Sequence, residues 1–538
     1  MAGAAERDAG LTAVYPAALA SGIRAVADRA AMNLMNLPIQ AESPDTFSTA
    51  HLKGDLKGRS VSGGLITLTS QGAQFLLQSA STVVLARLLV PADFGLVAMV
   101  TAITGVAQGF ADLGLSEATI QREQISHAQV STLFWINVAA GLLLMMVTVA
   151  LAPVLVWFYR EPRLRNITIL VSLTFLIGGL RVQHDALLKR QMRFLSVAIR
   201  DVTSSVLAVT AGVIMAWRGA GYWALAALPL ILNSAQMALS WSMSRWIPGL
   251  PRRDADVSSL LSFGGGVAGS YLIMNLNRST DNILVGWYWG AGPLGLYSRA
   301  YNLLMLPFRQ LIFPASSVAV SAFSRTQNDG DRFARFYLQA VNLMMWISTP
   351  IFGLLFVVAE PLIVLTLGEK WREAAPVFQL LALSALGQVI LESAIWSLVS
   401  RGQTNRLLKL SLLMSPILIG SYALGLPFGI KGVALSGSLV FVASLPWLFR
   451  FTFRETNLTL RRFGAAIVWP TMAGLASVLL SELVLHLLGP LGTSAVLLAA
   501  TLTFVPAYSA LMLIPTIRRE IISLKKIIDP FGILKRSA

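Results

Sequence analysis

An arginine and an aspartate lie three residues apart within otherwise membrane-like sequence, NLNRSTDNILVGWYWG at residues 275–290. On a helix, Arg278 and Asp281 would share one face. Arginine presents a planar fork of donors that fits anionic oxygen atoms. Aspartate can compete for that arginine or titrate with a coupling proton or sodium ion. Because a charge at the bilayer centre costs about 2.5–3.5 kcal/mol even on a lenient scale, the pair predicts a wet cavity or a locked ion pair.

Other ionisable residues fall in similar apolar surroundings. The candidates for the wall of a binding cavity are Arg278, Asp281, Arg309, Asp112 and Arg299. The candidates for ion coupling are Asp281, Glu392, His184 and Asp185. Two plainer interpretations stay open: Arg278 and Asp281 neutralise each other, and His184 and Asp185 mark the interfacial end of a helix.

The sequence argues against several kinds of chemistry. It has no cysteine, so disulfides, cysteine zinc sites and thiol catalysis are excluded. No His/Glu spacing is typical of a metal site, and no phosphate-binding loop of the G-x-x-x-x-G-K-[ST] type occurs. We therefore expect no cofactor, no metal and no catalytic residue.

The elements that must position these residues are membrane helices. Of the 538 residues, 55% are hydrophobic and 13% are charged, with a mean hydropathy of +0.67, whereas soluble chains carry about 25% charged residues. A spanning helix needs about 20 mostly apolar residues. Fourteen such stretches are predicted, at 61–86, 93–117, 130–157, 167–188, 196–217, 222–244, 258–288, 294–323, 336–358, 374–400, 406–426, 430–450, 464–488 and 493–516.

The basic residues predict the orientation of these helices. With the N-terminus inside, 27 lysines and arginines fall in cytoplasmic segments and 9 on the opposite side. Both termini are therefore expected in the cytoplasm of a multi-pass inner-membrane protein. This distribution also accounts for the net charge of +16 without a nucleic-acid partner. Residues 1–60 are expected to be a weakly ordered cytoplasmic extension, with Met32 or Met35 as alternative starts, and 517–538 a basic amphipathic tail.

The chain also contains an internal repeat. VVLARLLVPADFGLVAM at 83–99 aligns with ILVGWYWGAGPLGLYSR at 283–299, so Gly95 falls on Gly295. Two later matches, at offsets of 208 and 211, pair Pro153 with Pro361 and Arg190 with Arg401. Six helices per repeat predict two parallel lobes related by a pseudo-twofold axis along the membrane normal, with a substrate site between them. The expected domains are an N-lobe at 61–250, a C-lobe at 256–452 and two appended helices at 464–516.

Three stretches resemble the Wzx-type polysaccharide flippases of the polysaccharide transporter family: residues 85–144, LLKRQMRF at 187–194, and STDNILVGWYWGAGPLGLYSRAYNLL at 279–304. That family belongs to the multidrug/oligosaccharidyl-lipid/polysaccharide exporter superfamily. The resemblance implies two six-helix lobes around a cavity that opens alternately to either face. It also implies a lipid-linked oligosaccharide on an undecaprenyl pyrophosphate anchor as substrate, for lipopolysaccharide or exopolysaccharide biosynthesis.

On this interpretation, Arg278 and Arg309 would hold the pyrophosphate while the sugars occupy the cavity. Membrane lipids, a polysaccharide polymerase and a chain-length regulator are the further expected partners. A multidrug exporter and a lipid II flippase of the same superfamily remain alternatives. A membrane-embedded glycosyltransferase, ligase or polymerase is disfavoured, because such enzymes generally carry a long outer loop or domain and the outer loops here are short.

Overall fold

The computed structural model describes residues 56–108, 114–122, 124–251, 279–327, 329–454 and 456–514, together with Phe47. Within these ranges the secondary structure is helical, without a strand. The helices are α2 (Leu56–Leu88), α3 (Pro91–Gln108), α4 (Leu115–Gln121), α5 (His127–Tyr159), α6 (Leu164–Arg190), α7 (Phe194–Trp217), α8 (Tyr222–Ser244), α10 (Ala291–Pro307), η2 (Phe308–Ile312), α11 (Phe313–Ser324), α12 (Gly330–Val357), α13 (Ala359–Leu367), η3 (Glu369–Trp371), α14 (Ala374–Ser400), α15 (Thr404–Gly425), η4 (Leu426–Phe428), α16 (Gly429–Phe453), α17 (Leu460–Leu488) and α18 (Thr493–Met512). Residues 279–289 are also helical.

Most predicted spans coincide with helices of the structure. α8 and α14 have the predicted bounds, 222–244 and 374–400. α2 begins at Leu56, inside the predicted N-terminal extension. The predicted span 93–117 is interrupted at Gly114, whose φ of 66° is incompatible with a continuous helix, and α4 begins after it. α3 is described as far as Gln108, and residues 109–113 lie outside the described part of the chain.

Ten helices in the described part of the chain are long and apolar enough to cross a membrane. The chain is thus a polytopic helical membrane protein, although the predicted count of fourteen is not established. The basic tail at 517–538 and most of the span predicted at 258–288 lie outside the described residues.

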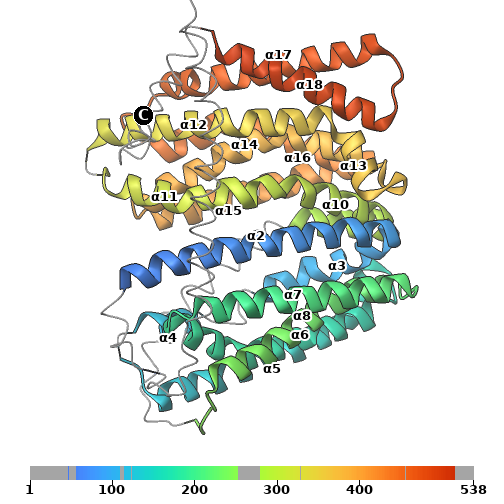
Figure 1. Ribbon diagram of the computed structural model, residues 1–538. Helices are drawn as coiled ribbons and strands as arrows, with labels where there is room; N and C mark the ends of the chain where they lie inside the picture. Colours follow the sequence, from blue (N-terminus) through green and yellow to red (C-terminus); the bar gives the residue numbers. More distant parts are fainter. Residues whose placement is uncertain are drawn as a thin grey trace, which may run out of the picture. The chain divides into compact units, whose positions relative to one another are not determined.

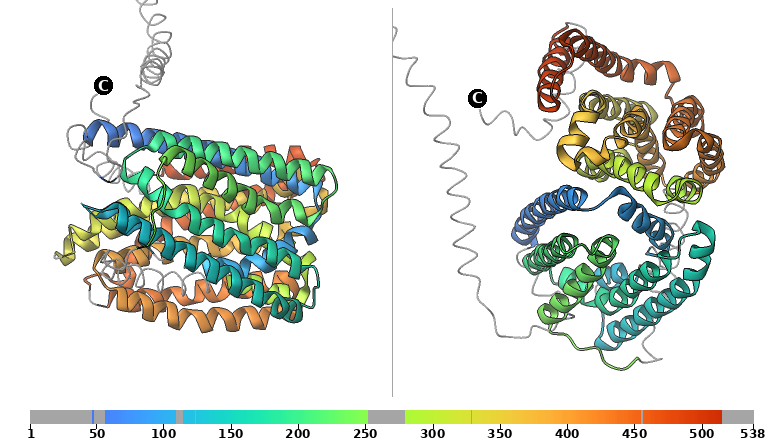
Figure 2. Two further views of the ribbon diagram at one scale, coloured as in Figure 1. Left: turned by 90° about the horizontal axis from the view of Figure 1, so that it is seen from below. Right: turned by 90° about the vertical axis from the view of Figure 1, so that its right-hand side faces the viewer.

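The helices lie side by side in two groups (Figure 1). In the first group, α5 packs on α6, α6 on α8, and α7 on α8 and α2. In the second group, α14 packs on α12 and α16, and α15 packs on α16. α17 and α18 pack on α12, on the side of the second group away from the first (Figure 2).

Backbone conformation supports the internal repeat. Arg160 closes α5 with a φ of 54°, and Gly368, which lies 208 residues later, closes α13 with a φ of 103°. Likewise, Met192 follows α6 with a φ of 53°, and Gly402 follows α14 with a φ of 67°, at an offset of 210. A residue of positive φ just past a helix end commonly stops the helix. The positions of these paired turns agree with the parallel repeat expected from the sequence, although Gly368, with a ψ of 168°, does not adopt the left-handed helical conformation of Arg160.

One predicted correspondence is wrong by a single residue. At the offset of 210, the residue equivalent to Arg401 is Gln191, and Arg190 matches Ser400. The turn hydrogen bonds agree, because Arg193 N donates to Leu188 O at 3.0 Å and Gln403 N donates to Leu398 O at 2.9 Å. The sequence alignment therefore made Arg190 equivalent to Arg401, whereas the turn geometry assigns the two arginines to positions one residue apart in the repeat.

Candidate functional site

The two groups of helices meet most extensively where α3 crosses α10. A Cβ built on Gly95 would overlap the carbonyl oxygen of Ala291, and one on Gly295 would overlap the carbonyl oxygen of Pro91. The two contacts are reciprocal, because Pro91 and Ala291 are 200 residues apart, as are Gly95 and Gly295. The pseudo-twofold axis therefore passes through this crossing, and glycine is required there so that the two backbones can touch.

Aromatic rings and a guanidinium surround this crossing. The guanidinium carbon of Arg299 lies 4.3 Å from the ring centroid of Phe94 in the other lobe, a cation–π contact. Phe94 packs edge-on against Trp371, with ring centroids 5.1 Å apart. Trp371 is fully buried, and its indole Nε1 donates to the carbonyl oxygen of Ala86 at 2.9 Å. Arg299, predicted in the cavity wall, is thus placed in the contact between the lobes.

Two basic residues cross the interface at the same end. Arg87 at the end of α2 donates to the carbonyl oxygens of Leu365 and Thr366 at the end of α13. Lys370 Nζ donates back to the carbonyl oxygen of Arg87 at 2.8 Å. We call Arg87 and Lys370 the clasp. Beside it lies a cavity of about 440 Å³, lined by Arg87, Val364, Leu367, Gly368, Glu369 and Lys370.

The loop that carries Lys370 has its own ion pair. Arg372 Nε lies 2.5 Å from Glu369 Oε1, and this hydrogen bond holds the pKa of Glu369 below its usual value. Arg372 also pairs with Glu360 at the start of α13. Segment 369–376 contains the short helix η3, which places Trp371 against the N-lobe.

Asp281 is buried, with only 5% of its surface exposed. Its Oδ2 accepts a hydrogen bond from the Tyr297 hydroxyl at 3.0 Å, and its Oδ1 accepts one from the Asn282 backbone at 2.7 Å. Tyr297 lies on α10, ten residues before Pro307, after which the helix continues as the π-helical turn that carries Arg309. The pairing of Asp281 with a tyrosine could not be seen from the spacing of the charges. Arg278, its predicted partner, lies outside the described residues, as does Asp112.

Arg309 lies in a break within the long helix 291–324. Pro307 has no backbone N–H, and the next residues, Phe308–Ile312, form a π-helical turn before α11 continues the helix. Such turns are frequent at functional sites. Phe308 is buried, with its ring 5.0 Å from that of Phe352, whereas Arg309 and Gln310 are exposed. Since an arginine facing hydrocarbon is costly, this exposure favours a water-filled space on that side of the helix.

Uncharged polar residues on the same helices were not singled out from the sequence. Gln71 and Gln78 on α2, Thr101 on α3 and Asn302 on α10 are all exposed. Gln71, Gln74 and Gln78 recur at i, i+3 and i+7, so they share one face of α2. This periodicity within an apolar span was the signal that could have identified them.

His184 and Asp185 lie in a buried network of the N-lobe. His184 is fully buried, its Nδ1 is 2.8 Å from Ser244 Oγ, and its ring lies 4.3 Å from that of Trp241. Asp185 pairs with Arg181 at 3.1 Å and with Arg200, and it accepts from Ser240 at 2.5 Å.

Asp201 completes the network by pairing with Arg200 at 2.6 Å. The two arginines, Arg181 and Arg200, balance the charges of the two aspartates. Each aspartate also accepts a hydrogen bond from an uncharged side chain, so the arrangement is that of a structural ion-pair network. Arg190 at the end of α6 is also buried: it is 4% exposed and donates to the carbonyl oxygen of Thr119 at 3.0 Å. Glu392 is half-buried on α14. A coupling role for these groups stays a prediction.

No group of three or more histidines, cysteines, aspartates or glutamates within the described ranges could hold a metal ion. The two groups of helices are joined at one end by the α3–α10 crossing and the clasp. Further along, α2, α3 and α10 carry the exposed polar side chains named above, and Arg309 lies in the turn that follows α10.

Comparison with known proteins bears on the family and the fold. The chain is 26% identical over 304 residues to the teichuronic acid biosynthesis protein TuaB of Bacillus subtilis (strain 168), covering 56% of this chain and 63% of TuaB. It is 28% identical over 309 residues to the lipopolysaccharide biosynthesis protein WzxC of Escherichia coli (strain K12), covering 56% and 62%. Each match thus spans less than two thirds of the relative.

Solved structures support the fold alone. The lipid II flippase MurJ, in an inward closed conformation, superimposes with a TM-score of 0.67 at 13% identity, over 86% of this chain and 100% of MurJ. An inward-facing multidrug resistance MATE family transporter, described as a member of the MOP superfamily, superimposes with a TM-score of 0.55 at 12% identity, over 70% of this chain and 94% of the transporter. A family profile described as "Polysaccharide biosynthesis protein" matches residues 84–376, more than half of the chain. The resemblance to Wzx-type proteins is confirmed, and the chain belongs to the polysaccharide biosynthesis protein family.

Proposed function

We propose that the chain moves a lipid-linked oligosaccharide across the inner membrane of a bacterium by alternating access. The observation that carries this proposal is the reciprocal crossing of α3 and α10. Two repeat-related lobes that touch closely at one end can rock about that contact, and rocking exposes the space between them to either face. The family match and the names of the relatives favour a polysaccharide precursor as the cargo.

The chemistry of the space suits such a cargo. Hydroxyl-rich sugars lose several kcal/mol for each polar group that enters hydrocarbon unpaired. The glutamines of α2, with Thr101 and Asn302, supply hydrogen-bond partners in their place. Arg309, together with Arg278, would contact the pyrophosphate through charge-assisted hydrogen bonds. Asp281 and the other carboxylates remain candidates for ion coupling.

By the distribution of lysine and arginine, the clasp and the α3–α10 crossing lie at the outer face. The conformation described here would then be closed outside, ready to receive substrate from the cytoplasm. The lipid tail would stay in the bilayer while the headgroup passes between the lobes. On this view the protein is a transporter and neither makes nor breaks a covalent bond.

Deleting the gene and locating radiolabelled lipid-linked oligosaccharide in the two leaflets tests the proposal. We expect repeat units to be trapped on the cytoplasmic side and surface polysaccharide to be lost. Normal surface polymer combined with altered susceptibility to cationic drugs would instead indicate a multidrug exporter. Arrested cell-wall synthesis would indicate a lipid II flippase.

A further inference from the structure

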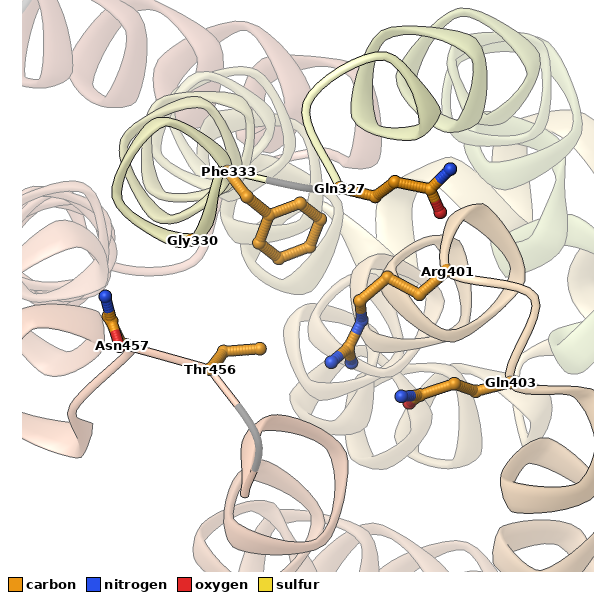
Figure 3. A pocket seen from close by; sticks show the side chains of 7 residues that line it. All are labelled: Gln327, Gly330, Phe333, Arg401, Gln403, Thr456 and Asn457. Carbon is orange, nitrogen blue, oxygen red and sulfur yellow. The ribbon is translucent and has the colours of Figure 1, made fainter.

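A second cavity, of about 320 Å³, lies within the C-terminal half at the opposite end of the helices from the clasp (Figure 3). Three connections meet there: the one between α11 and α12, the one between α14 and α15, and the one between α16 and α17. The lining residues are Gln327, Gly330, Phe333, Arg401, Gln403, Thr456 and Asn457. The volume is at the lower end of the range of small-molecule sites, which begins near about 300 Å³.

The guanidinium of Arg401 is fixed in this cavity. Its Nε donates to Ser397 O at 3.1 Å, and its Nη2 donates to Thr452 O at 2.8 Å. Its guanidinium carbon also lies 5.5 Å from the ring centroid of Phe333. Figure 3 shows this group between Phe333, Thr456 and Gln403. The positive charge is therefore already oriented at the cavity, which lowers the entropic cost of binding an anion.

The carboxylates of the same connections are already engaged. Asp331 accepts a hydrogen bond from Asn457 Nδ2 at 3.0 Å, and Asp329 caps α12 by accepting from the Arg332 backbone at 3.0 Å. Against these two aspartates, the described parts of the connections and the adjoining helix ends carry eight arginines, namely Arg325, Arg332, Arg401, Arg406, Arg450, Arg454, Arg461 and Arg462. The balance of charge favours an anionic ligand with several acceptor oxygens, which is the chemistry of a phosphate group.

The surroundings point to a membrane lipid as the source of that phosphate. Leu408 follows Gln403 on α15, and Leu460 follows Asn457 at the start of α17; each is 43% exposed. These exposed leucines lie three to five residues along the chain from residues that line the cavity, where they offer an apolar surface for acyl chains. A soluble anion would gain nothing from them.

We propose that this cavity binds the phosphate headgroup of an anionic phospholipid from the leaflet at this end of the helices. The lipid contacts all three connections and so ties the start of α17 to the C-lobe. The site lies apart from the space between the lobes, so the proposal does not depend on the transport function.

The test uses the purified full-length protein in detergent with phosphatidylglycerol, phosphatidylcholine or inorganic phosphate as probes. Lipid retention is followed by native mass spectrometry, and thermal unfolding is followed in parallel. Gln403→Glu keeps the shape of the side chain and an acceptor for Arg406, whose Nη1 lies 3.3 Å from Gln403 Oε1, but adds a negative charge to the cavity. Asn405→Asp adds the same charge at an exposed position that does not line the cavity.

We expect phosphatidylglycerol to bind and stabilise the wild type and Asn405→Asp, and Gln403→Glu to bind it about tenfold more weakly because like charges repel. Arg401→Lys, which keeps the charge but loses the planar fork, is expected to weaken binding as well. Equal stabilisation by millimolar inorganic phosphate would overturn the lipid assignment in favour of a soluble anion. If neither Gln403→Glu nor Arg401→Lys changes the binding of phosphatidylglycerol, the lipid does not occupy this cavity and the proposal is wrong.

Discussion

At the scale of single residues, Asp281 illustrates what burial demands of a charge. A buried carboxylate is stable only when its oxygens accept hydrogen bonds. Two donors meet it here, the Tyr297 hydroxyl and the Asn282 backbone N–H. The tyrosine comes from the next helix, so the pair also fixes how segment 279–289 packs on α10.

Removing that hydroxyl with Tyr297→Phe should leave one carboxylate oxygen without its donor. We expect the free energy of unfolding to fall by about 1–3 kcal/mol, the usual cost of an unsatisfied buried polar group. Thermal unfolding of the purified protein in detergent measures this. Tyr288→Phe, at a residue that is 51% exposed, is the control and should change nothing. Equal unfolding temperatures for both variants would show that Asp281 does not need this bond.

The exposure of Arg309 favours a role in transport over a role in the stability of the fold. Arg309→Gln should lower transport of the lipid-linked oligosaccharide about tenfold or more, because a charge-assisted hydrogen bond contributes about 1.5–3 kcal/mol and 1.4 kcal/mol is tenfold. The unfolding temperature should not change, since the side chain is exposed. Arg335→Gln, an exposed arginine near the start of α12, is the matched control. The same loss in both variants would remove the case for a specific contact.

At the scale of helices, the crossing of α3 and α10 is the feature on which the two-lobed arrangement depends. Each helix contributes one glycine and one carbonyl oxygen, in equivalent positions of the repeat. The backbones approach so closely that no side chain fits between them. The contact therefore fixes the point along each helix at which the two helices cross, and it is made by the backbones without long interdigitating side chains.

Gly95→Ala should force the two helices apart. We expect destabilisation of about 1–3 kcal/mol, as for overpacking elsewhere, together with reduced transport. Gly105→Ala on the same helix meets open space and should be neutral or slightly stabilising, because alanine favours helix by about 0.5–1 kcal/mol. Thermal unfolding of the two variants side by side checks the prediction. Tolerance of Gly95→Ala would contradict the crossing.

At the scale of the whole molecule, the absence of cysteine makes movement of the lobes directly testable. In Arg87→Cys/Lys370→Cys, a short reducible bifunctional thiol reagent should join the lobes at the clasp. We expect cross-linking to stop transport and reduction to restore it, because the lobes must separate there. The single variants control for loss of the clasp itself, and Glu369→Cys/Arg372→Cys places a cross-link within one lobe. Undiminished transport in the cross-linked protein would rule out opening at this end.

Much of this architecture is determined by the sequence itself. A bilayer requires long apolar stretches whose backbone is bonded internally, so the spans at 222–244 and 374–400 could be predicted from local composition. The repeat could be found because Gly95 and Gly295 are needed for the same close contact in both halves. Charged residues inside spans are rare enough to be noticed without any structure.

Only the tertiary structure decided what those residues touch. Asp281 accepts a hydrogen bond from Tyr297 of another helix, a partner that the spacing of Arg278 and Asp281 does not indicate. Arg200 is buried among carboxylates from two helices, which its place in the sequence does not indicate. Arg299 lies over a ring of the opposite lobe. These contacts depend on how distant helices pack, and hydrophobic periodicity along the chain carries no information about the partner of a given face.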